Sequence, residues 1–344
     1  MNFKKSMSSS KVSKKNYKME MVQQVLEKFP NATTRGIARY LMALYPLDFT
    51  DYENTRANVR YMRGERKDRK PAETVAERTE QQKKEAMIKF QIPDSDYKEV
   101  EPFVMPILNN RILLLTDIHL PYHDEKALDT ALTWGKGKNP NAIILNGDTI
   151  DMYQASRYIK DRRLRDLAGE LEMTREFLKQ LKEEFDCPIY FKIGNHEARW
   201  ENYLKSVAPE LLGIADFELK NVLRFGELGV MEIKSTQIIK VGKLNVMHGH
   251  EFGHSVFSPV NAARGLYMRA KANSMIGHHH QTSEHSEKDL NGDVVTTWSV
   301  GTLAGLSPEY MPFNKWNHGF AWIDLNRDET FEVRNMRIIN GKIC

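Results

Sequence analysis

The run AIILNGDTID, residues 142–151, decides the fold of this chain. Four consecutive apolar residues, 142–145, are typical of a strand buried on both faces, as in a parallel sheet covered by helices. The run stops at Asn146, and Gly147 and Asp148 then place a flexible turn and a carboxylate directly after it. Loops at the carboxyl ends of strands are where α/β sheets bind ligands, so we expect Asp148 to belong to a site.

Four other strand-like runs end in metal-ligand residue types in the same way: ILLLTDIH (112–119), PIYFKIGNHE (188–197), MHGH (247–250) and GHHH (277–280). Helical periodicity separates the first three strands of the series, which predicts an α/β fold with a sheet that is at least partly parallel. After about residue 229 strands dominate, apart from one helix near residues 259–272. Because the carboxyl ends of such strands converge, five loops spread over more than 160 positions can meet in one crevice.

Composition and charge divide the chain into two parts. It has 344 residues, 41% hydrophobic and 28% charged, with no apolar run near the length of a membrane span. Residues 1–90 hold 20 Lys/Arg against 11 Asp/Glu, a net of +9, and residues 91–344 hold 30 against 35, a net of −5. All 11 histidines lie from His119 to His318. This asymmetry indicates a basic front module and a histidine-rich second module.

The cysteines and the first residues bear on the compartment. Cys187 and Cys344 are the two cysteines, too few for a disulfide framework or a cysteine-based zinc site. The start of the chain is positively charged, but no apolar segment follows it, so it is not typical of a secretory signal. We therefore expect a reducing compartment, the cytoplasm, and no membrane partner.

Four segments are expected along the chain: a disordered basic tail at 1–16, a small helical module at 17–63, a charged linker at 64–99 and a catalytic domain at 100–344. In the helical module, Thr33 or a neighbour and Asp51 are candidate caps for the second and third helices. Arg56, Arg60 and Arg63 share one face of the third helix. Three helices with such a stripe resemble a helix-turn-helix unit that binds DNA or RNA. A solvated basic face in a docking or oligomerisation module is the alternative.

The side chains after the strands suit divalent metals, because carboxylate, imidazole and amide groups are ligands for Mn, Fe or Zn. Asp117 and His119 are two positions apart, so in an extended segment both point to one side. Two ions about 3.5–4 Å apart can hold a hydroxide and clamp a phosphoryl group during in-line attack.

The ordered series Asp-x-His, Gly-Asp, Gly-Asn-His-Glu, His and Gly-His-x-His resembles the calcineurin-like metallophosphoesterases over residues of about 110–325. One such motif alone is weak, but five in order, each after a strand, are specific. The resemblance implies an α/β sandwich of two mixed sheets flanked by helices, preceded here by the all-α module. It also implies hydrolysis of a phosphate ester by a metal-bridged hydroxide. Two divalent ions would hold this hydroxide, with Mn as the favoured metal and Fe or Zn as alternatives.

The resemblance also assigns residues. It places Asp117, His119 and His280 on one metal, Asn195, His248 and His278 on the other, and Asp148 between them. His196 would protonate the leaving oxygen or stabilise the transition state.

Several other positions are less specific. Arg199 could bind a phosphate oxygen, or it could form a salt bridge with Glu197 or Asp151. His250 could contact substrate or support a ligand from behind. Trp298, Trp316 and Trp322 are expected to pack the second sheet.

The sequence departs from the protein Ser/Thr phosphatases of this group at one place. Those proteins follow Gly-Asp-x-Val-Asp with Arg-Gly, whereas Met152 and Tyr153 stand here. A protein phosphatase is therefore disfavoured, and the organisation is similar to phosphoesterases of phages and bacteria.

Three functions remain open from the sequence. The first is a phosphodiesterase or nuclease, with the basic module gathering DNA or RNA by counterion release. The second is a phosphomonoesterase or nucleotide phosphatase whose front module regulates or docks. The third is a nucleic-acid-binding protein with a structural metal domain. The intact set of ligand types argues against the third.

Overall fold

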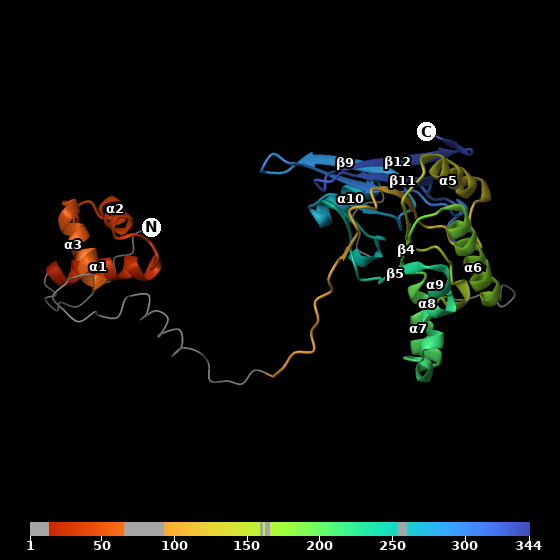
Figure 1. Cartoon of the computed structure of the whole chain (residues 1–344), viewed down its shortest axis with the longest axis horizontal. Coiled ribbons are helices and arrows are strands. Elements are labelled where there is room, and N and C mark those ends of the chain that lie inside the picture. Colours follow the sequence, from red (N-terminus) through yellow and green to blue (C-terminus); the bar gives the residue numbers. More distant parts are fainter. Residues whose placement is uncertain (1–13, 65–92, 159–160, 162–165, 254–259) are drawn as a thin grey trace. The chain divides into compact units, whose positions relative to one another are not determined.

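The computed structural model describes residues 14–64, 93–158, 161, 166–253 and 260–344 (Figure 1). The chain forms two compact units, Met1–Asp96 and Tyr97–Cys344. Residues 1–13 of the predicted tail at 1–16 and most of the predicted linker at 64–99 lie outside the described residues. The tail prediction is wrong for residues 14–16, which begin the first helix. In the described part of the chain, no helix is both long and apolar enough to cross a membrane.

The first unit contains three helices, α1 (Lys14–Lys28), α2 (Thr34–Leu44) and α3 (Tyr52–Met62). Two of the expected caps are present: the Thr33 hydroxyl accepts a hydrogen bond from the backbone nitrogen of Gly36, and Asp51 accepts one from that of Asn54. These side chains satisfy amides that the first turn of a helix leaves without partners. One apolar core joins the helices, and its buried members are Met21, Val22, Val25, Leu26, Ile37, Leu41, Phe49 and Val59.

The second unit contains two mixed sheets, as the resemblance implies. The larger has seven strands in the order β13-β12-β11-β2-β3-β4-β5. They are β2 (Arg111–Leu115), β3 (Ala142–Asn146), β4 (Ile189–Lys192), β5 (Val230–Ile233), β11 (His318–Leu325), β12 (Phe331–Ile339) and β13 (Lys342–Ile343). The run from β2 to β5 is parallel, and β11, β12 and β13 extend it antiparallel.

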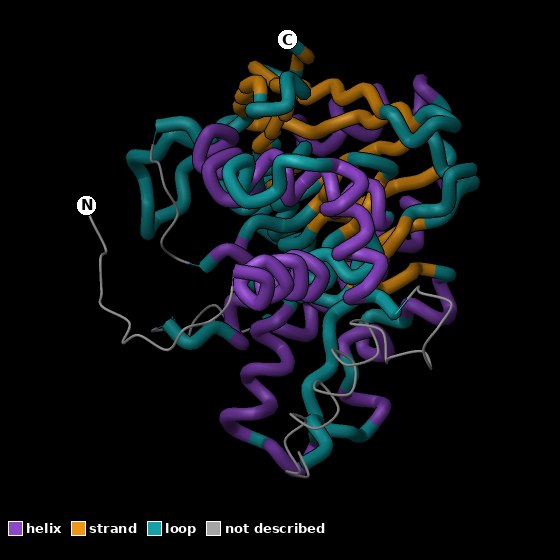
Figure 2. Tube along the Cα trace, turned by 90° about the vertical axis from the view of Figure 1, so that its left-hand side faces the viewer, coloured by secondary structure: helices purple, strands orange, loops and turns teal. Residues whose placement is uncertain are grey.

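The smaller sheet has six strands in the order β1-β6-β7-β8-β10-β9. They are β1 (Phe103–Val104), β6 (Ile239–Val241), β7 (Leu244–Val246), β8 (Ser274–Ile276), β9 (Ser283–Lys288) and β10 (Val294–Ser299). The strands of both sheets are the orange tubes of Figure 2. The apolar run near residue 241 divides into β6 and β7 because Gly242, with φ +55°, makes the turn between them. Strand β9 was not predicted, since its sequence SEHSEK has no apolar alternation and it lies at the sheet edge.

The continuous apolar runs of β2 to β4 have cores on both faces. Ile112 and Leu114 point into the core between the two sheets, and Leu113 and Leu115 point into the core under the helices. This alternation follows from the period of two along a strand. It confirms the inference that strands without polar alternation are buried on both sides.

Helices cover the outer faces of the two sheets. Helices α5 (Glu125–Lys138) and α6 (Leu167–Glu184) contribute to the core on the outer face of the larger sheet, and α10 (Ala262–Ala270) contacts β8, β9 and β10 of the smaller one (Figure 1). The shorter helices α7 (Ala198–Val207), α8 (Leu219–Val222) and α9 (Phe225–Leu228) lie between β4 and β5 in the sequence.

Candidate metal centre

Five loops bring the predicted ligands together. Asp117, Asp148 and Asn195 follow the parallel neighbours β2, β3 and β4, so their loops emerge from one edge of the larger sheet. His248 follows β7 and His278 follows β8, which are parallel neighbours in the smaller sheet. Side chains more than 160 positions apart thereby come within 4 Å of one another.

The first group contains Asp117, His119 and His280. Nε2 of His119 lies 3.3 Å from Nε2 of His280 and 3.9 Å from Oδ1 of Asp117, and Nε2 of His280 lies 3.1 Å from that oxygen. On the other side of its ring, Nδ1 of His119 is 3.0 Å from Oδ1 of Asp151. A carboxylate oxygen accepts, so Nδ1 carries the hydrogen and Nε2 of His119 presents a lone pair to the group.

The second group contains Asp148, Asn195, His248 and His278. Nε2 of His248 lies 3.2 Å from Oδ2 of Asp148 and 3.1 Å from Oδ1 of Asn195. Its Nδ1 donates to the backbone oxygen of Asn146 at 2.8 Å, and a carbonyl can only accept. Nε2 of a neutral His248 ring is therefore an acceptor that faces two other acceptors. His278 joins Asp148 and His248 in a set whose ligand atoms all lie within 4.8 Å of one another.

Asp148 lies between the two groups. Its Oδ2 is 3.2 Å from His248, 3.7 Å from Nε2 of His196 and 4.0 Å from Nε2 of His119. Within the described part of the chain, three sets of residues could hold an ion, and they share members: Asp117 with His119 and His280, His119 with Asp148 and His196, and Asp148 with His248 and His278.

The donor chemistry fits divalent cations. Two buried carboxylates, four imidazoles and one amide oxygen converge, and lone pairs face lone pairs at hydrogen-bond distance. Such an arrangement is unfavourable without positive charge between the groups, since buried charges need pairing or a metal. Imidazole and carboxylate ligands suit first-row metals.

Burial and charge perturb the groups of the centre strongly. Burial alone would raise the pKa of Asp148, but His196, His248 and His119, in their protonated forms, hold it well below its usual value. Against the effect of burial, Asp148 and Asp117 in turn raise the pKa of His248 to about 10, so a proton or a metal ion can supply the positive charge between these groups. Burial and the nearby imidazole of His248 lower the pKa of His278 to about 3. A neutral imidazole is the form that binds a metal, so His278 is preorganised for that task.

The backbone of the centre is unusual at the same positions. Five of the predicted ligands have left-handed φ angles of 52–60°: Asp117, His119, Asp148, His278 and His280. Residues other than glycine seldom adopt this backbone conformation, and those that do cluster at functional sites. The strain is held by hydrogen bonds such as that from the backbone nitrogen of His278 to Asp117 at 2.9 Å.

Small residues allow the loops to approach one another. A Cβ on Gly194 would lie 2.3 Å from Oδ1 of Asp148 and 2.6 Å from its backbone nitrogen. A Cβ on Gly147, whose φ is +86°, would lie 2.5 Å from the His248 ring. Both positions therefore require glycine.

Glu197 is a structural member of the centre that sequence reasoning did not assign. Its buried carboxylate accepts hydrogen bonds from the backbone nitrogens of Asp148, Thr149 and Gly194 at 2.7–2.9 Å. It thereby ties the β3 loop to the β4 loop. Its place in Gly-Asn-His-Glu was visible in the sequence, but its hydrogen-bond partners, almost 50 positions away, were not.

His196 and Arg199 lie beside Asp148. Nδ1 of His196 donates to the backbone oxygen of Asp151 at 2.9 Å, and its Nε2 lies 2.8 Å from Nη2 of Arg199. A guanidinium only donates, so this arrangement leaves His196 neutral with Nε2 accepting. Arg199 also donates to the Asp151 backbone oxygen at 2.7 Å, and its Nη1 lies 3.7 Å from the Asp151 carboxylate. Of the two salt-bridge partners that the sequence offered, Asp151 is the one this arginine contacts.

His250 and Trp316 also lie near the ligands, and the Trp316 ring is the closer of the two to a ligand ring. His250 is held by Ser235, whose Oγ lies 2.8 Å from its Nε2, and its ring is 5.3 Å from that of His248. Trp316 lies edge to face with His280, with ring centroids 4.3 Å apart. The expectation that Trp316 packs the second sheet is therefore wrong, because the β10–β11 loop carries it to the metal centre. Trp298 does lie in the core between the sheets. The expectation is wrong for Trp322 as well, because β11 joins the larger sheet beside β2 and places Trp322 in the core under the helices.

The sequence model for the calcineurin-like phosphoesterases matches residues 110–301, more than half of the chain and all the residues of the two groups. The chain belongs to the calcineurin-like phosphoesterase family. A calcineurin-like phosphoesterase is a hydrolase of phosphate esters that uses divalent metals, which agrees with the ligand atoms found together here.

Relatives of this calcineurin-like phosphoesterase include two phage proteins. It is 27% identical over 232 residues to the Gene 54 protein of Mycobacterium phage L5, which covers 64% of this chain and 90% of that protein. Its identity to the Gene 54 protein of Mycobacterium phage D29 is 26%, with the same coverage.

Solved structures similar to this chain include Vacuolar Protein Sorting 29 from Cryptosporidium parvum, with a TM-score of 0.38, 15% identity and coverage of 68% of this chain and 94% of that one. The phosphoesterase Yfce from E. coli has a TM-score of 0.31 and 13% identity, and the match covers 65% of this chain and 98% of that one.

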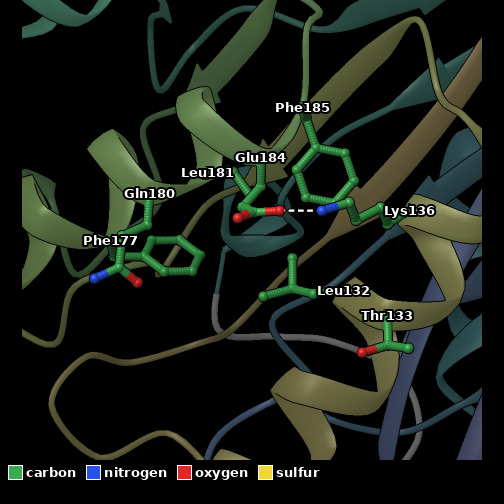
Figure 3. Close-up of a pocket in the computed structure, with 8 residues that line it drawn as sticks. All are labelled: Leu132, Thr133, Lys136, Phe177, Gln180, Leu181, Glu184 and Phe185. Atoms are coloured by element: carbon green, nitrogen blue, oxygen red, sulfur yellow. Dashed lines mark hydrogen bonds and ion pairs between the residues drawn. The ribbon is translucent and has the colours of Figure 1, made fainter.

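A separate hollow of about 290 Å³ lies between α5 and α6, lined by Leu132, Phe177, Leu181 and Phe185 and crossed by the Lys136–Glu184 ion pair (Figure 3). It is formed by the carboxyl-terminal halves of the two helices. In β-α units these ends lie away from the carboxyl ends of the strands, and no predicted ligand lines the hollow.

Proposed function

We propose that this calcineurin-like phosphoesterase is a dinuclear metal enzyme that hydrolyses phosphodiester bonds of nucleic acid. The observation that carries the proposal is the position of Asp148, with Oδ2 within 3.2–4.0 Å of imidazoles from both groups. A carboxylate in this position can serve two ions at once.

In this proposal Asp117, His119 and His280 hold one ion, Asn195, His248 and His278 hold the other, and Asp148 is shared. Two divalent ions would supply positive charge for the phosphoryl oxygens and lower the pKa of water. Mn²⁺ is the favoured metal, and Fe or Zn are the alternatives. The protein orients this set through partners behind it, such as Asp151 at His119 and Asn146 at His248.

His196 and Arg199 act on the substrate in this proposal. His196 Nε2 lies 3.7 Å from the shared carboxylate, close enough to serve the leaving oxygen once it carries a proton. Arg199 now donates to that same nitrogen, and its fork-shaped guanidinium suits a phosphate oxygen equally well. His250, which is hydrogen-bonded to Ser235, would contact a part of the substrate that lies farther from the ligands.

Nucleic acid is the favoured substrate because the front module is basic. Arg35 and Arg39 are four positions apart on α2 and both are exposed, so they offer phosphate contacts on one helix face. The phage origin of the two relatives supports a role in an infected bacterial cell.

One observation favours a second candidate, a phosphomonoesterase with a regulatory or docking module. The predicted arginine stripe is partly engaged within the module: Arg63 donates to Thr34 Oγ1 at 3.1 Å and to the Ala32 backbone oxygen, and Arg56 pairs with Glu53. These two arginines thus stabilise the helices, which leaves fewer cations for a polyanion.

A substrate panel with the full chain tests the proposal. Single-stranded and duplex DNA, RNA, a generic phosphodiester and a generic phosphomonoester are each assayed with Mn²⁺ and with a chelator. We expect metal-dependent cleavage of nucleic acid, lowered about 1,000-fold by Asp148→Asn. The exposed Asp186→Asn is the matched control and should retain the rate. Turnover of the monoester alone would establish the second candidate instead.

A further inference from the structure

Exposed aromatic side chains lie on loops that lead away from the metal centre, and neither metal binding nor proton transfer gives them a task. Tyr122, Tyr158, Tyr310 and Phe313 are 46%, 64%, 75% and 97% exposed. Together with Trp316, which contacts His280, we call them the aromatic rim. Large exposed apolar groups grouped near a site usually mark a binding surface.

The loop that carries three of the five rim residues is built onto the metal centre. This loop, residues 305–316, leaves the Val300–Ala304 segment, where the backbone nitrogen of Leu303 donates to the oxygen of Asp117 at 3.0 Å. It returns at Asn317, whose backbone nitrogen donates to the oxygen of His280 at 2.9 Å. Both ends of the loop are therefore fixed to residues of the first metal group.

The other side of the rim follows the first two ligand loops. Tyr122 comes three residues after His119, and its backbone oxygen accepts from the nitrogen of Gly305 at 2.9 Å. Tyr158 stacks under the Arg157 guanidinium, whose Cζ is 5.4 Å from the ring centroid. Stacked cations and rings of this kind are typical of surfaces that hold a charged, flat ligand.

Tyr310 lies close to the charged groups of the centre. Partial burial and the negative charge of Asp151 raise the pKa of Tyr310, and Arg199 opposes this shift. The residue as a whole is nevertheless 75% exposed. The ring centroid of Trp316 lies 6.3 Å from that of Tyr310, which leaves the two side chains as neighbouring aromatic surfaces.

We propose that the aromatic rim binds the unpaired base of a nucleotide whose phosphate lies in the metal centre. This inference rests on the proposed function, and it narrows the substrate to esters that carry an accessible base. Aromatic rings stack on any base, because every base has a flat π-face. Bases within a duplex are already stacked on each other, so a single strand or a free nucleotide is the matching ligand.

Pairs of substrates with and without a base test the inference. The diester pair is an oligothymidylate and an abasic oligomer of the same length, and the monoester pair is thymidine 5′-monophosphate and 2-deoxyribose 5-phosphate. The full-length protein with Mn²⁺ is assayed for kcat/KM on each. We expect the base to raise kcat/KM about tenfold, and Tyr310→Ala and Phe313→Ala each to bring the ratio toward one.

Leu290→Ala is the control, since Leu290 is an exposed apolar residue at the far end of the β9–β10 hairpin. It should leave the ratio unchanged. Equal kcat/KM with and without a base in the wild type, or a ratio that survives both rim substitutions, overturns the inference and leaves the phosphodiesterase standing. Hydrolysis of the monoester pair alone, with a base preference, supports the rim and overturns the phosphodiesterase. If neither pair is hydrolysed, both proposals fail.

Discussion

Oδ1 of Asp151 lies 3.0 Å from Nδ1 of His119, and this contact decides which ring nitrogen faces Asp117. The same oxygen lies 3.0 Å from Nδ1 of His196. Asp151 thus orients both a proposed ligand, through its carboxylate, and the proposed acid, through its backbone oxygen.

Asp151→Asn should weaken metal binding and activity together, by about 10- to 100-fold. The amide keeps the shape but loses the charge that favours hydrogen on Nδ1 of His119. The measurement is activity as a function of Mn²⁺ concentration, with Asp129→Asn on the exposed face of α5 as control. An unchanged Mn²⁺ dependence would show that Asp151 does not orient the ligand.

Removal of the Glu170 charge should alter how stability depends on pH. Burial and the neighbouring Asp151 raise the pKa of Glu170 to about 7 from its ordinary value of 4.5. The folded state therefore holds this proton more tightly than the unfolded state. Its contribution to stability is complete below pH 4.5 and is lost as pH rises through about 7.

As the pH rises from 5 to 8, the unfolding free energy of Glu170→Gln should therefore increase by about 1–2 kcal/mol relative to that of the wild type. This is less than the full pKa shift of Glu170 implies, because solvent screens part of the charge. All five tryptophans lie after residue 130, so their fluorescence reports unfolding of the second unit by urea. Glu172→Gln, exposed on the same helix, should show no such gain. If the difference in unfolding free energy between Glu170→Gln and wild type does not change with pH, the raised pKa of Glu170 is contradicted.

Gly194→Ala should destabilise the second unit by about 1–3 kcal/mol and lower activity, because the new methyl group would overlap the backbone of Asp148. Gly137→Ala is the matched change, since a Cβ there meets nothing within 4 Å and the position is helical. Urea unfolding should find it neutral or stabilised by up to about 1 kcal/mol. Equal behaviour of the two variants would contradict the close approach of the β3 and β4 loops.

The double variant Arg35→Ala/Arg39→Ala should bind single-stranded DNA more weakly and with a shallower salt dependence, because each arginine that neutralises a phosphate adds about one unit to the slope. Fluorescence anisotropy with the Asp148→Asn protein measures binding without cleavage. Arg56→Ala is the comparison, because Arg56 is paired with Glu53 and should alter the slope little. An unchanged slope in the double variant would favour the regulatory or docking role of the module.

The sequence alone determined most of the elements, though not strand β9, and it determined the chemistry of the centre. Apolar runs, helical periods and the caps at Thr33 and Asp51 are local signals, and the structure has a helix or strand for each of them. The order of the ligand types could also be predicted from the sequence, because each ligand residue lies within a few residues of the end of its strand.

Tertiary structure decided which atoms face each other. The sequence does not show that Asp151 orients two histidines, that Glu197 ties two loops together, or that Trp316 rests on His280 instead of in a core. It also does not show that Arg63 is engaged by Thr34 and Ala32. The physical reason is that periodicity is set by neighbours along the chain, whereas these contacts depend on strand order, loop conformation and the competition of each polar group for a partner.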